Sequence, residues 1–290
     1  MQIKDRIAKE KGFVSLEFFP PKEKEAWPSF FSEVEKLKRI NPLFVSVTYG
    51  AGGGTQAGTL DIVTRLKKEH GLEPMAHLTC VGASEKSLHG FLSSLEKAGI
   101  LNILALGGDK PQNAGDSFVE NEKFKYASDL VGFMRKHYAD FGVGVAAYPE
   151  KHPTAVSAED DLGRLKNKLD IGGDFAVTQL FFDNELYFDF VKRAKKIGIE
   201  KPVIPGVMPI LSLKRIKRII SMCGASIPAG LMAKLNEADK KGGDSAVEKV
   251  GIEHAIAQAR DLLDNGAPGV HLYTLNKADL CLSLYDGLMS

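Results

Sequence analysis

The stretch FVSLEFFPPKEKEAWPSFFSEVEKLKRINPLFVSVT, residues 13–48, contains a strand, a helix and a second strand in order. Residues 13–18 and 43–48 are short and almost wholly apolar, which is typical of strands buried on both faces of a parallel sheet. Residues 27–40 between them are amphipathic and long enough for a helix. This order favours parallel strands connected through helices.

The same alternation continues along the chain. Further apolar runs lie at 74–79, 102–106, 142–148, 175–181, 202–207 and 269–274, with amphipathic stretches such as 59–69, 85–97 and 157–170 between them. Eight such units predict an α/β protein with an eight-stranded parallel (βα)8 barrel, the TIM barrel. The alternative is an open doubly wound sheet, which would concentrate its site near one switch point. Polar residues end strands along the whole chain, which favours the barrel.

Residues 212–265, between the seventh and eighth predicted strands, are more than one helix requires. They indicate two or three extra helices, separated by the breakers IPAG and KKGG. The chain has no internal repeat or low-complexity linker, and its 290 residues with 44% hydrophobic content can bury one large core. We therefore expect residues 1–290 to form a single barrel domain.

The charges nearly cancel, with 38 Lys and Arg against 37 Asp and Glu, so no strong field attracts nucleic acid or an anionic membrane. The N-terminus has no apolar signal region, and no stretch approaches the roughly 18 apolar residues of a membrane span. We expect a cytoplasmic protein without nucleic-acid or membrane partners. Cys80, Cys223 and Cys281 are widely spaced, which predicts reduced thiols in apolar surroundings and neither a disulfide framework nor a zinc site.

Nearly every predicted strand ends in a polar residue. These residues are Glu17, Thr48, His77, Asp109, Tyr148, Gln179 and Tyr273. In a parallel barrel the carboxyl ends of the strands meet at one mouth, where barrel enzymes keep their active sites. These residues therefore indicate where an active site would lie, but not which reaction it catalyses.

Two of these residues stand out chemically. Glu17 precedes FFPPK, and apolar neighbours disfavour a carboxylate anion, so Glu17 could hold a proton near neutrality and act as a general acid. The alternative is a carboxylate paired with a lysine or arginine at the rim. Gln179 places a primary amide in an apolar strand, where an unsatisfied amide costs about 1–3 kcal/mol. It should therefore face a ligand or a partner inside the barrel.

The other candidates leave two interpretations open. The glycines of TYGAGGGTQAGT, residues 48–59, could approach a phosphate or a flat ring, or form a flexible turn. His77 could be a catalyst or a hydrogen-bonded core residue. Asp109 could point into the mouth or serve as a turn residue. Tyr148 and His152 of AAYPEKHP could contact an adenine or ribose, or cap the next helix.

The sequence has no HExxH motif, metal-ligand histidine cluster or GxSxG elbow, so we expect no metal and disfavour metal-assisted hydrolysis and serine chemistry. Converging Glu, Asp, Gln, Thr, His and Tyr side chains without a strong nucleophile fit a site that holds a cofactor and lets it react.

In chain order, LEFFPPK, VSVTYGAGGGTQ, HLTC, NILALGGDKP, YASDLV, AAYPEKHP, TQLFFD, IPGVMPI and LYTLN closely resemble motifs of the methylenetetrahydrofolate reductase family. The resemblance extends over nearly the whole chain and corresponds to the catalytic barrel, without the regulatory extension of eukaryotic members. It implies a homo-oligomeric (βα)8 barrel that carries FAD and reduces 5,10-methylenetetrahydrofolate to 5-methyltetrahydrofolate. NAD(P)H would reduce the flavin and leave before the folate binds, in a ping-pong mechanism.

The resemblance also implies roles for single residues. Glu17 matches the general acid that assists opening of the imidazolidine ring. Asp109 matches an acidic residue near the flavin pyrimidine, where negative charge would favour a cationic folate. Gln179 matches a contact to folate and nicotinamide. The positions that hold FAD are Thr48, His77, Gly108, Asp109, Tyr126, Ala127, Tyr148, His152, Asp161 and Lys168, and those on the folate side include Arg215, Tyr273 and Lys277.

Five positions depart from the family pattern. Gly107 replaces an arginine that contacts the flavin, Arg215 replaces a folate-side glutamine, and Lys277 replaces an arginine. Arg164 and Asn167 stand where many bacterial members have Asn and Arg, which moves the basic residue by three positions on the same helix face. The alternatives are a flavin-free reductase that passes hydride directly from nicotinamide to folate, a reductase that receives electrons from a partner subunit, and a non-redox pterin-binding barrel.

Overall fold

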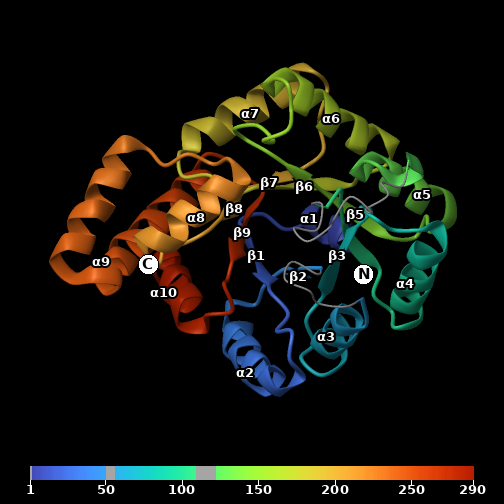
Figure 1. The fold of residues 1–290 in the computed structure, drawn as a ribbon, viewed down its shortest axis with the longest axis horizontal. Coiled ribbons are helices and arrows are strands. Elements are labelled where there is room, and N and C mark those ends of the chain that lie inside the picture. Colours follow the sequence, from blue (N-terminus) through green and yellow to red (C-terminus); the bar gives the residue numbers. More distant parts are fainter. Residues whose placement is uncertain (1, 50–55, 109–121) are drawn as a thin grey trace, which may run out of the picture.

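The structure, a computed structural model, describes residues 2–49, 56–108 and 122–290 (Figure 1). Its strands all pair in parallel. They are β1 (Phe13–Phe18), β2 (Val45–Val47), β3 (Pro74–Thr79), β4 (Asn102–Leu106), β5 (Gly142–Ala147), β6 (Phe175–Thr178), β7 (Val203–Ile204), β8 (Gly206–Val207) and β9 (Gly269–Tyr273). The order in the sheet is β7-β6-β5-β4-β3-β2-β1-β9-β8.

Strands β7 and β8 are two halves of one predicted strand. Pro205 lies between them and has no N–H to donate to a ladder, so it interrupts the strand. β7 pairs with β6 and β8 pairs with β9, while the Pro205 carbonyl accepts a hydrogen bond from His271 N at 2.9 Å. The predicted eight-stranded barrel is confirmed, and it closes through residues 203–207.

Helices surround the strands, as Figure 1 shows. The ring consists of α2 (Trp27–Leu37), α3 (Gln56–Lys68), α4 (Glu85–Lys97), α5 (Ala127–His137), α6 (Ala158–Ile171), α7 (Asn184–Lys196) and α10 (Ala278–Met289), with short 3-10 turns at Lys24–Ala26, Lys38–Ile40 and Glu122–Phe124. Apolar residues of the helices and of the outward strand faces, among them Leu16, Phe18 and Val34, form the largest core cluster.

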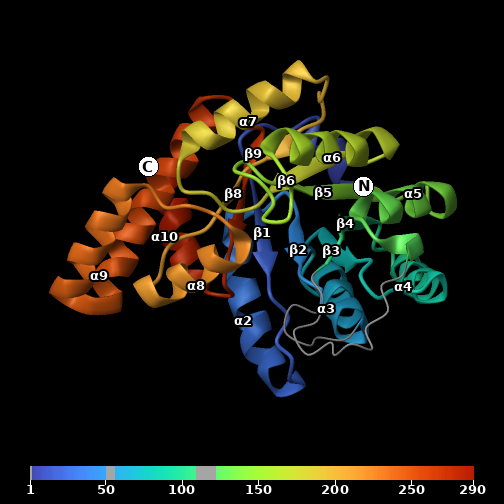
Figure 2. The same cartoon turned by 45° about the horizontal axis from the view of Figure 1, so that its top comes forward.

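The long connection between β8 and β9 forms the predicted extra helices. α8 (Leu213–Cys223) and α9 (Ala229–Asp264) lie with α10 at one side of the barrel (Figure 2). α9 is broken at Gly242 and Gly243, where Gly243 has a φ of 60°. The helix break predicted at KKGG is therefore present, and it lies between two helical segments of α9.

The side chains inside the barrel are apolar at one end and polar toward the other. Side chains alternate along β1, so Phe13 faces the interior cluster while its neighbour Val14 faces the helices. Helix α1 (Ile3–Ile7) packs its two isoleucines into the same interior cluster, and Ile3 N donates to Asn102 Oδ1 at 3.0 Å. This apolar cluster fills the end of the barrel at which the strands begin, and polar side chains follow toward the other end.

The cysteines behave as expected from their spacing. All three are unbridged, and Cys80 and Cys281 are buried. Burial raises the pKa of the Cys80 thiol to about 11 and that of Cys281 to about 12, so both remain protonated at neutral pH. Within residues 2–49, 56–108 and 122–290, no helix has the length and apolar character needed to cross a membrane.

Candidate active site

Glu17 lies inside the barrel near the carboxyl end of β1, and only 6% of its surface is exposed. Its Oε2 lies 3.5 Å from His77 Nε2 of β3 and 3.6 Å from His271 Nε2 of β9. Ser46 Oγ of β2 donates to the same oxygen at 3.4 Å. Within the described part of the chain, the basic side chains within 4.0 Å of its carboxyl oxygens are these histidines and not the lysine or arginine of the alternative interpretation.

His271 connects Glu17 to a second hydroxyl group. Its Nδ1 lies 2.8 Å from Ser15 Oγ, and its Nε2 lies 3.3 Å from Ser46 Oγ. The fully buried ring stacks on Phe44 with 5.6 Å between centroids. His271 was not among the predicted site residues, because the strand residues predicted for the site lie at strand ends. The available signal was its spacing of two from Tyr273, which places both on the same face of β9.

His77 is a buried and neutral histidine. Burial lowers its pKa to about 4, although the neighbouring Glu17 carboxylate acts in the opposite direction. Its Nε2 has no hydrogen-bond partner among the residues that the structure describes. A buried polar atom without a partner is costly, so this nitrogen is a place where a bound group would complete the hydrogen bonding.

The segment after β9 fixes the end of β1. Asn276 Nδ2 donates to Phe19 O at 2.6 Å, and Asn276 Oδ1 accepts from Phe19 N at 3.0 Å. Thr274 Oγ1 donates to the Glu17 carbonyl at 2.6 Å. Leu275 and Asn276 have φ values of 51° and 56°, a backbone region uncommon for residues other than glycine. These side-chain bonds hold the strained turn and with it the position of Glu17.

Tyr148, His152, Asp161 and Lys168 form a connected group beyond β5. The rings of Tyr148 and His152 are 4.7 Å apart, and His152 N donates to Asp161 Oδ2 at 3.0 Å. Lys168 Nζ donates to Ala146 O at 2.6 Å. Burial lowers the pKa of Lys168 to about 8, and Asp161 offsets part of this effect. A desolvated ammonium group favours the binding of an anion.

The two glycines after β4 have different surroundings. Gly108 has a φ of +88°, and a Cβ there would lie 2.5 Å from Val81 Cγ1, so glycine is required. A Cβ on Gly107 would meet, among the described atoms, only Ala127 N at 4.0 Å. Among the described atoms there is therefore room for a larger side chain at Gly107, next to the start of α5. Tyr126, which precedes α5, is 52% exposed.

Gln179 and Tyr273 lie at the ends of β6 and β9. Gln179 was predicted to lie inside an apolar strand, but β6 ends at Thr178 and Gln179 is half-buried, so its placement in the strand is wrong, while its contact with a ligand stays a prediction. Gln179 Oε1 accepts from Leu180 N at 2.9 Å, and the residue lines a small pocket that Tyr148 also lines. Tyr273 donates its hydroxyl to Thr178 O at 2.7 Å, and burial raises its pKa well above the usual value.

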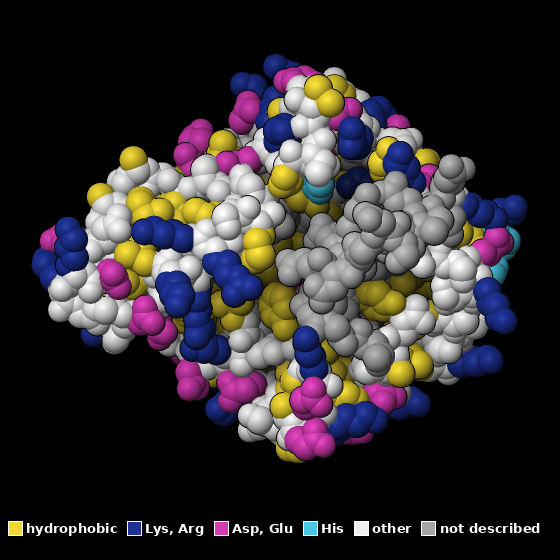
Figure 3. Space-filling view, in the orientation of Figure 1, with side chains coloured by type: hydrophobic (Ala, Val, Ile, Leu, Met, Phe, Trp, Pro, Cys, Tyr) yellow, Lys and Arg dark blue, Asp and Glu magenta, His cyan; other side chains and the backbone are white. Residues whose placement is uncertain are grey.

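An apolar pocket of about 410 Å³ lies between the segment after β8 and helix α8. Its lining includes the apolar residues Phe19, Met208 and Leu275 and the basic residues Arg215 and Arg218 of α8. Figure 3 shows apolar side chains in the hollow of this face, with basic side chains beside it over α8. A pocket of this kind suits a flat apolar group that carries negative charge.

The order of strands in the barrel separates the predicted residues into two groups. One group follows β2 to β5 and comprises Thr48, His77, Gly108, Tyr126, Ala127, Tyr148, His152, Asp161 and Lys168. The other follows β6, β8 and β9 and comprises Gln179, Arg215, Tyr273 and the exposed Lys277. Glu17 on β1 lies between the two, because β1 pairs with both β2 and β9. Asp109 and residues 50–55, which include the predicted glycine turn, lie outside the described residues.

Comparison with known proteins gives consistent matches. A family model described as methylenetetrahydrofolate reductase matches residues 2–289. The chain is 39% identical over 291 residues to methylenetetrahydrofolate reductase (NADH) 1 of Arabidopsis thaliana, covering 95% of this chain and 49% of the relative. It is 38% identical over 272 residues to 5,10-methylenetetrahydrofolate reductase of Escherichia coli K12, covering 93% and 88%. The chain thus spans about half the length of the plant relative.

Among solved structures, one similar fold is an uncharacterized protein from Clostridium thermocellum that binds two copies of 5-methyl-5,6,7,8-tetrahydrofolic acid. The TM-score is 0.67 with 16% sequence identity, and the match covers 99% of this chain and 100% of the other. At this identity the likeness concerns the fold.

Proposed function

Because the chain belongs to the methylenetetrahydrofolate reductase family, as its motifs predicted, we propose that it reduces 5,10-methylenetetrahydrofolate to 5-methyltetrahydrofolate with NAD(P)H as electron donor. The observation that carries this proposal is the buried Glu17 carboxyl, held in the mouth by contacts with Ser46, His77 and His271. The reaction needs a proton as well as a hydride, and this group is placed to give one.

The proton step uses residues of β1, β3 and β9. Glu17 donates a proton to the folate nitrogen whose bond to the methylene carbon breaks, and the resulting iminium carbon is the one that accepts the hydride. His271 Nε2, 3.6 Å from Glu17 Oε2, can share the proton, and Nδ1 of the same ring is hydrogen-bonded to Ser15. His77 remains neutral, since burial lowers its pKa to about 4, so it does not add a positive charge beside the cationic folate.

FAD, when bound, would accept hydride from the nicotinamide and give it to the folate in alternating half-reactions. The residues after β2 to β5 fit such a group. The desolvated Lys168 ammonium suits a pyrophosphate, and His77 Nε2, which has no hydrogen bond among the described residues, suits a polar edge of a ring. Thr48, Tyr126, Tyr148 and His152 add hydroxyl groups and rings on the same side, next to Gly108, Ala127 and Asp161.

The residues on the other side of Glu17 fit the folate. The apolar pocket lined by Phe19 and Leu275 suits an aromatic ring, and Arg215 and Arg218 suit carboxylates attached to it. Gln179 and Tyr273 lie at the ends of β6 and β9, where hydrogen-bonding groups would orient the pterin. Lys277 keeps a positive charge at the start of α10, although it lacks the bidentate geometry of an arginine.

Anaerobic spectroscopy of each half-reaction tests the proposal. After reconstitution with FAD, the protein should show a flavin spectrum that NADH bleaches and methylenetetrahydrofolate restores. Folate reduction without bound flavin would support the flavin-free alternative suggested by Gly107. Bound flavin that NADH does not bleach, but an added electron-transfer protein does, would support a partner subunit. No absorbance change with NADH or with 5-methyltetrahydrofolate would favour a non-redox pterin-binding barrel.

A further inference from the structure

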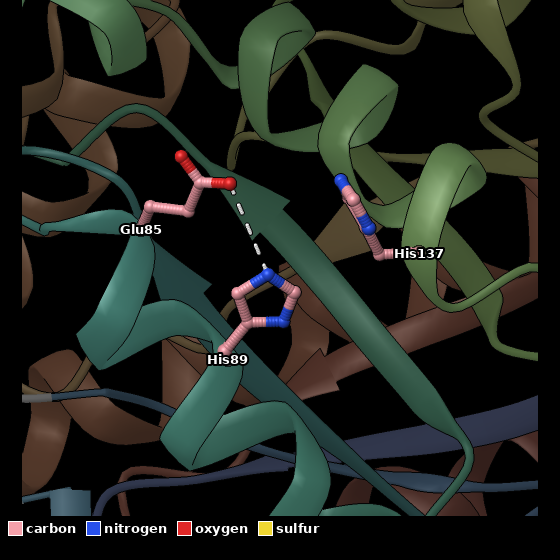
Figure 4. A group of neighbouring side chains, drawn as sticks. All are labelled: Glu85, His89 and His137. Atoms are coloured by element: carbon pink, nitrogen blue, oxygen red, sulfur yellow. Dashed lines mark ion pairs between the residues drawn. The ribbon is translucent and has the colours of Figure 1, made fainter.

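Three side chains that the proposed site does not use converge between helices α4 and α5 (Figure 4). Glu85 and His89 are four residues apart on α4 and therefore share one face of that helix. His137 is the last residue of α5 and faces them from the neighbouring helix. One donor atom from each residue lies within 4.8 Å of the other two, and Glu85 Oε1 lies 3.9 Å from His89 Nε2.

The ring of His89 is held in place by Tyr138. The Tyr138 hydroxyl lies 2.9 Å from His89 Nδ1, 3.1 Å from the His89 carbonyl and 3.0 Å from Ser93 Oγ. When Nδ1 donates its hydrogen to this hydroxyl, Nε2 presents a lone pair on the side of Glu85. Phe133 packs against the ring with 4.8 Å between centroids. Metal-binding histidines are commonly oriented by an outer partner in this way.

The two carboxylate oxygens of Glu85 have different partners. Oε2 forms an ion pair with Lys123 Nζ, while Oε1 lies on the side of His89. The same ammonium group would repel a cation bound at Oε1. Lys123 should therefore weaken metal binding without preventing it.

We propose that Glu85, His89 and His137 bind a divalent transition-metal ion of the zinc class, with water completing its coordination. Two imidazole nitrogens and one carboxylate oxygen are an established ligand set for zinc. Metal–ligand distances of about 2 Å place tetrahedral ligand atoms roughly 3.4 Å apart, so the donor atoms must approach one another. The Glu85 side chain is 42% exposed and His137 is also exposed, so both can rotate toward the fixed ring of His89.

A bound ion would connect the first turns of α4 to the last residue of α5 on the outside of the barrel. This inference does not depend on the reductase activity, because none of the three residues belongs to the proposed active site. The sequence shows no metal motif here, since the two histidines lie on different helices and come together only when the barrel forms.

Titration of tag-free, metal-stripped protein with Co²⁺ tests the proposal, because the visible absorption of Co²⁺ reports its ligands. The protein should bind one equivalent of Co²⁺ with a tetrahedral or five-coordinate spectrum, and Zn²⁺ should displace it. His137→Ala and Glu85→Gln should weaken Zn²⁺ binding at least tenfold, and loss of the outer partner in Tyr138→Phe should weaken it by about 10- to 100-fold. Lys123→Gln should tighten it.

His70→Gln is the matched control. His70 Nδ1, in the turn after α3, lies 3.0 Å from Glu35 Oε2 of α2 and forms a similar histidine–carboxylate pair, but it is not part of the three-residue cluster. Its replacement should leave metal affinity unchanged. Metal binding should also raise the melting temperature of the wild type and not that of Glu85→Gln. Absence of stoichiometric binding, or equal affinities of wild type, His137→Ala and Glu85→Gln, would overturn the proposal.

Discussion

The surroundings of Glu17 come from residues that are distant in the sequence. Its neighbours Leu16 and Phe18 belong to the outer core under the helices, because side chains alternate along β1. The groups at its carboxyl are Ser46, His77 and His271 from three other strands. The carboxyl is therefore buried, as its apolar sequence context suggested, but it is buried in a polar cluster that can exchange protons with it.

Replacing Glu17 with glutamine tests this role. Glu17→Gln keeps the shape of the side chain but removes the acid, so the folate half-reaction should slow by about 10²- to 10⁴-fold, the usual contribution of a general acid. Reduction of the flavin by NADH needs no such acid and should keep its rate. Anaerobic stopped-flow absorbance measures both. Equal losses in the two half-reactions would show that Glu17 is structural.

Gly107 gives a second prediction for a single residue. The space around it accepts a side chain, since the nearest described atom to a Cβ there is Ala127 N at 4.0 Å. Gly107→Arg should add one charge-assisted hydrogen bond to bound FAD, worth about 1.5–3 kcal/mol, and so tighten binding by roughly tenfold or more. Flavin fluorescence titration measures the affinity.

Gly108→Ala is the control for that substitution. Its Cβ would lie 2.5 Å from Val81 Cγ1 in a backbone with a φ of +88°, so it should disturb the β4 end and weaken FAD binding. If Gly107→Arg left the FAD affinity unchanged while the protein stayed folded, Gly107 would not face the cofactor.

Strands and helices follow from local pattern, whereas contacts between them do not. The apolar runs located every strand, but Pro205 splits the seventh because it cannot donate to the ladder. The glycines of KKGG located the break in α9, because glycine disfavours a continuous helix. The contacts of His271 with Glu17 and Ser15 arise only where the first and last strands pair, so no local pattern reveals them. The exposure of Gln179 was missed because β6 ends earlier than its apolar run.

The turn after β9 yields a prediction for a whole element. Asn276→Ala removes both hydrogen bonds to Phe19 and leaves alanine at a φ of 56°, so it should lower the free energy of unfolding by about 1–3 kcal/mol. It should also slow the folate half-reaction, because Glu17 loses part of its support. Urea unfolding and stopped-flow absorbance measure the two effects.

Asn276→Gly separates the effect of the lost hydrogen bonds from the effect of backbone strain. Glycine relieves the backbone strain at positive φ but makes neither bond to Phe19. It should destabilise the protein less than alanine does, while its effect on the folate half-reaction should be similar. Wild-type rates in both variants would mean that the turn does not position Glu17.

At the scale of the molecule, the barrel is closed by apolar packing at one end and carries its ionisable groups toward the other. α1 and the interior cluster around Phe44 and Phe175 fill the first end. Glu17, His77 and His271 lie beyond them, inside the same barrel. The protonation of a side chain in this position is therefore coupled to the stability of the whole fold.

His77 makes this coupling measurable. Burial lowers its pKa from 6.5 to about 4, so between these values the unfolded chain binds a proton that the folded protein does not. The stabilising contribution is complete above about pH 6.5 and is lost as the pH falls toward 4, by up to ~3 kcal/mol. Urea unfolding at a series of pH values should show this decline in the wild type. His77→Gln cannot take up the proton, so its unfolding free energy should fall less steeply over the same window, and equal slopes would show that His77 titrates normally in the folded protein.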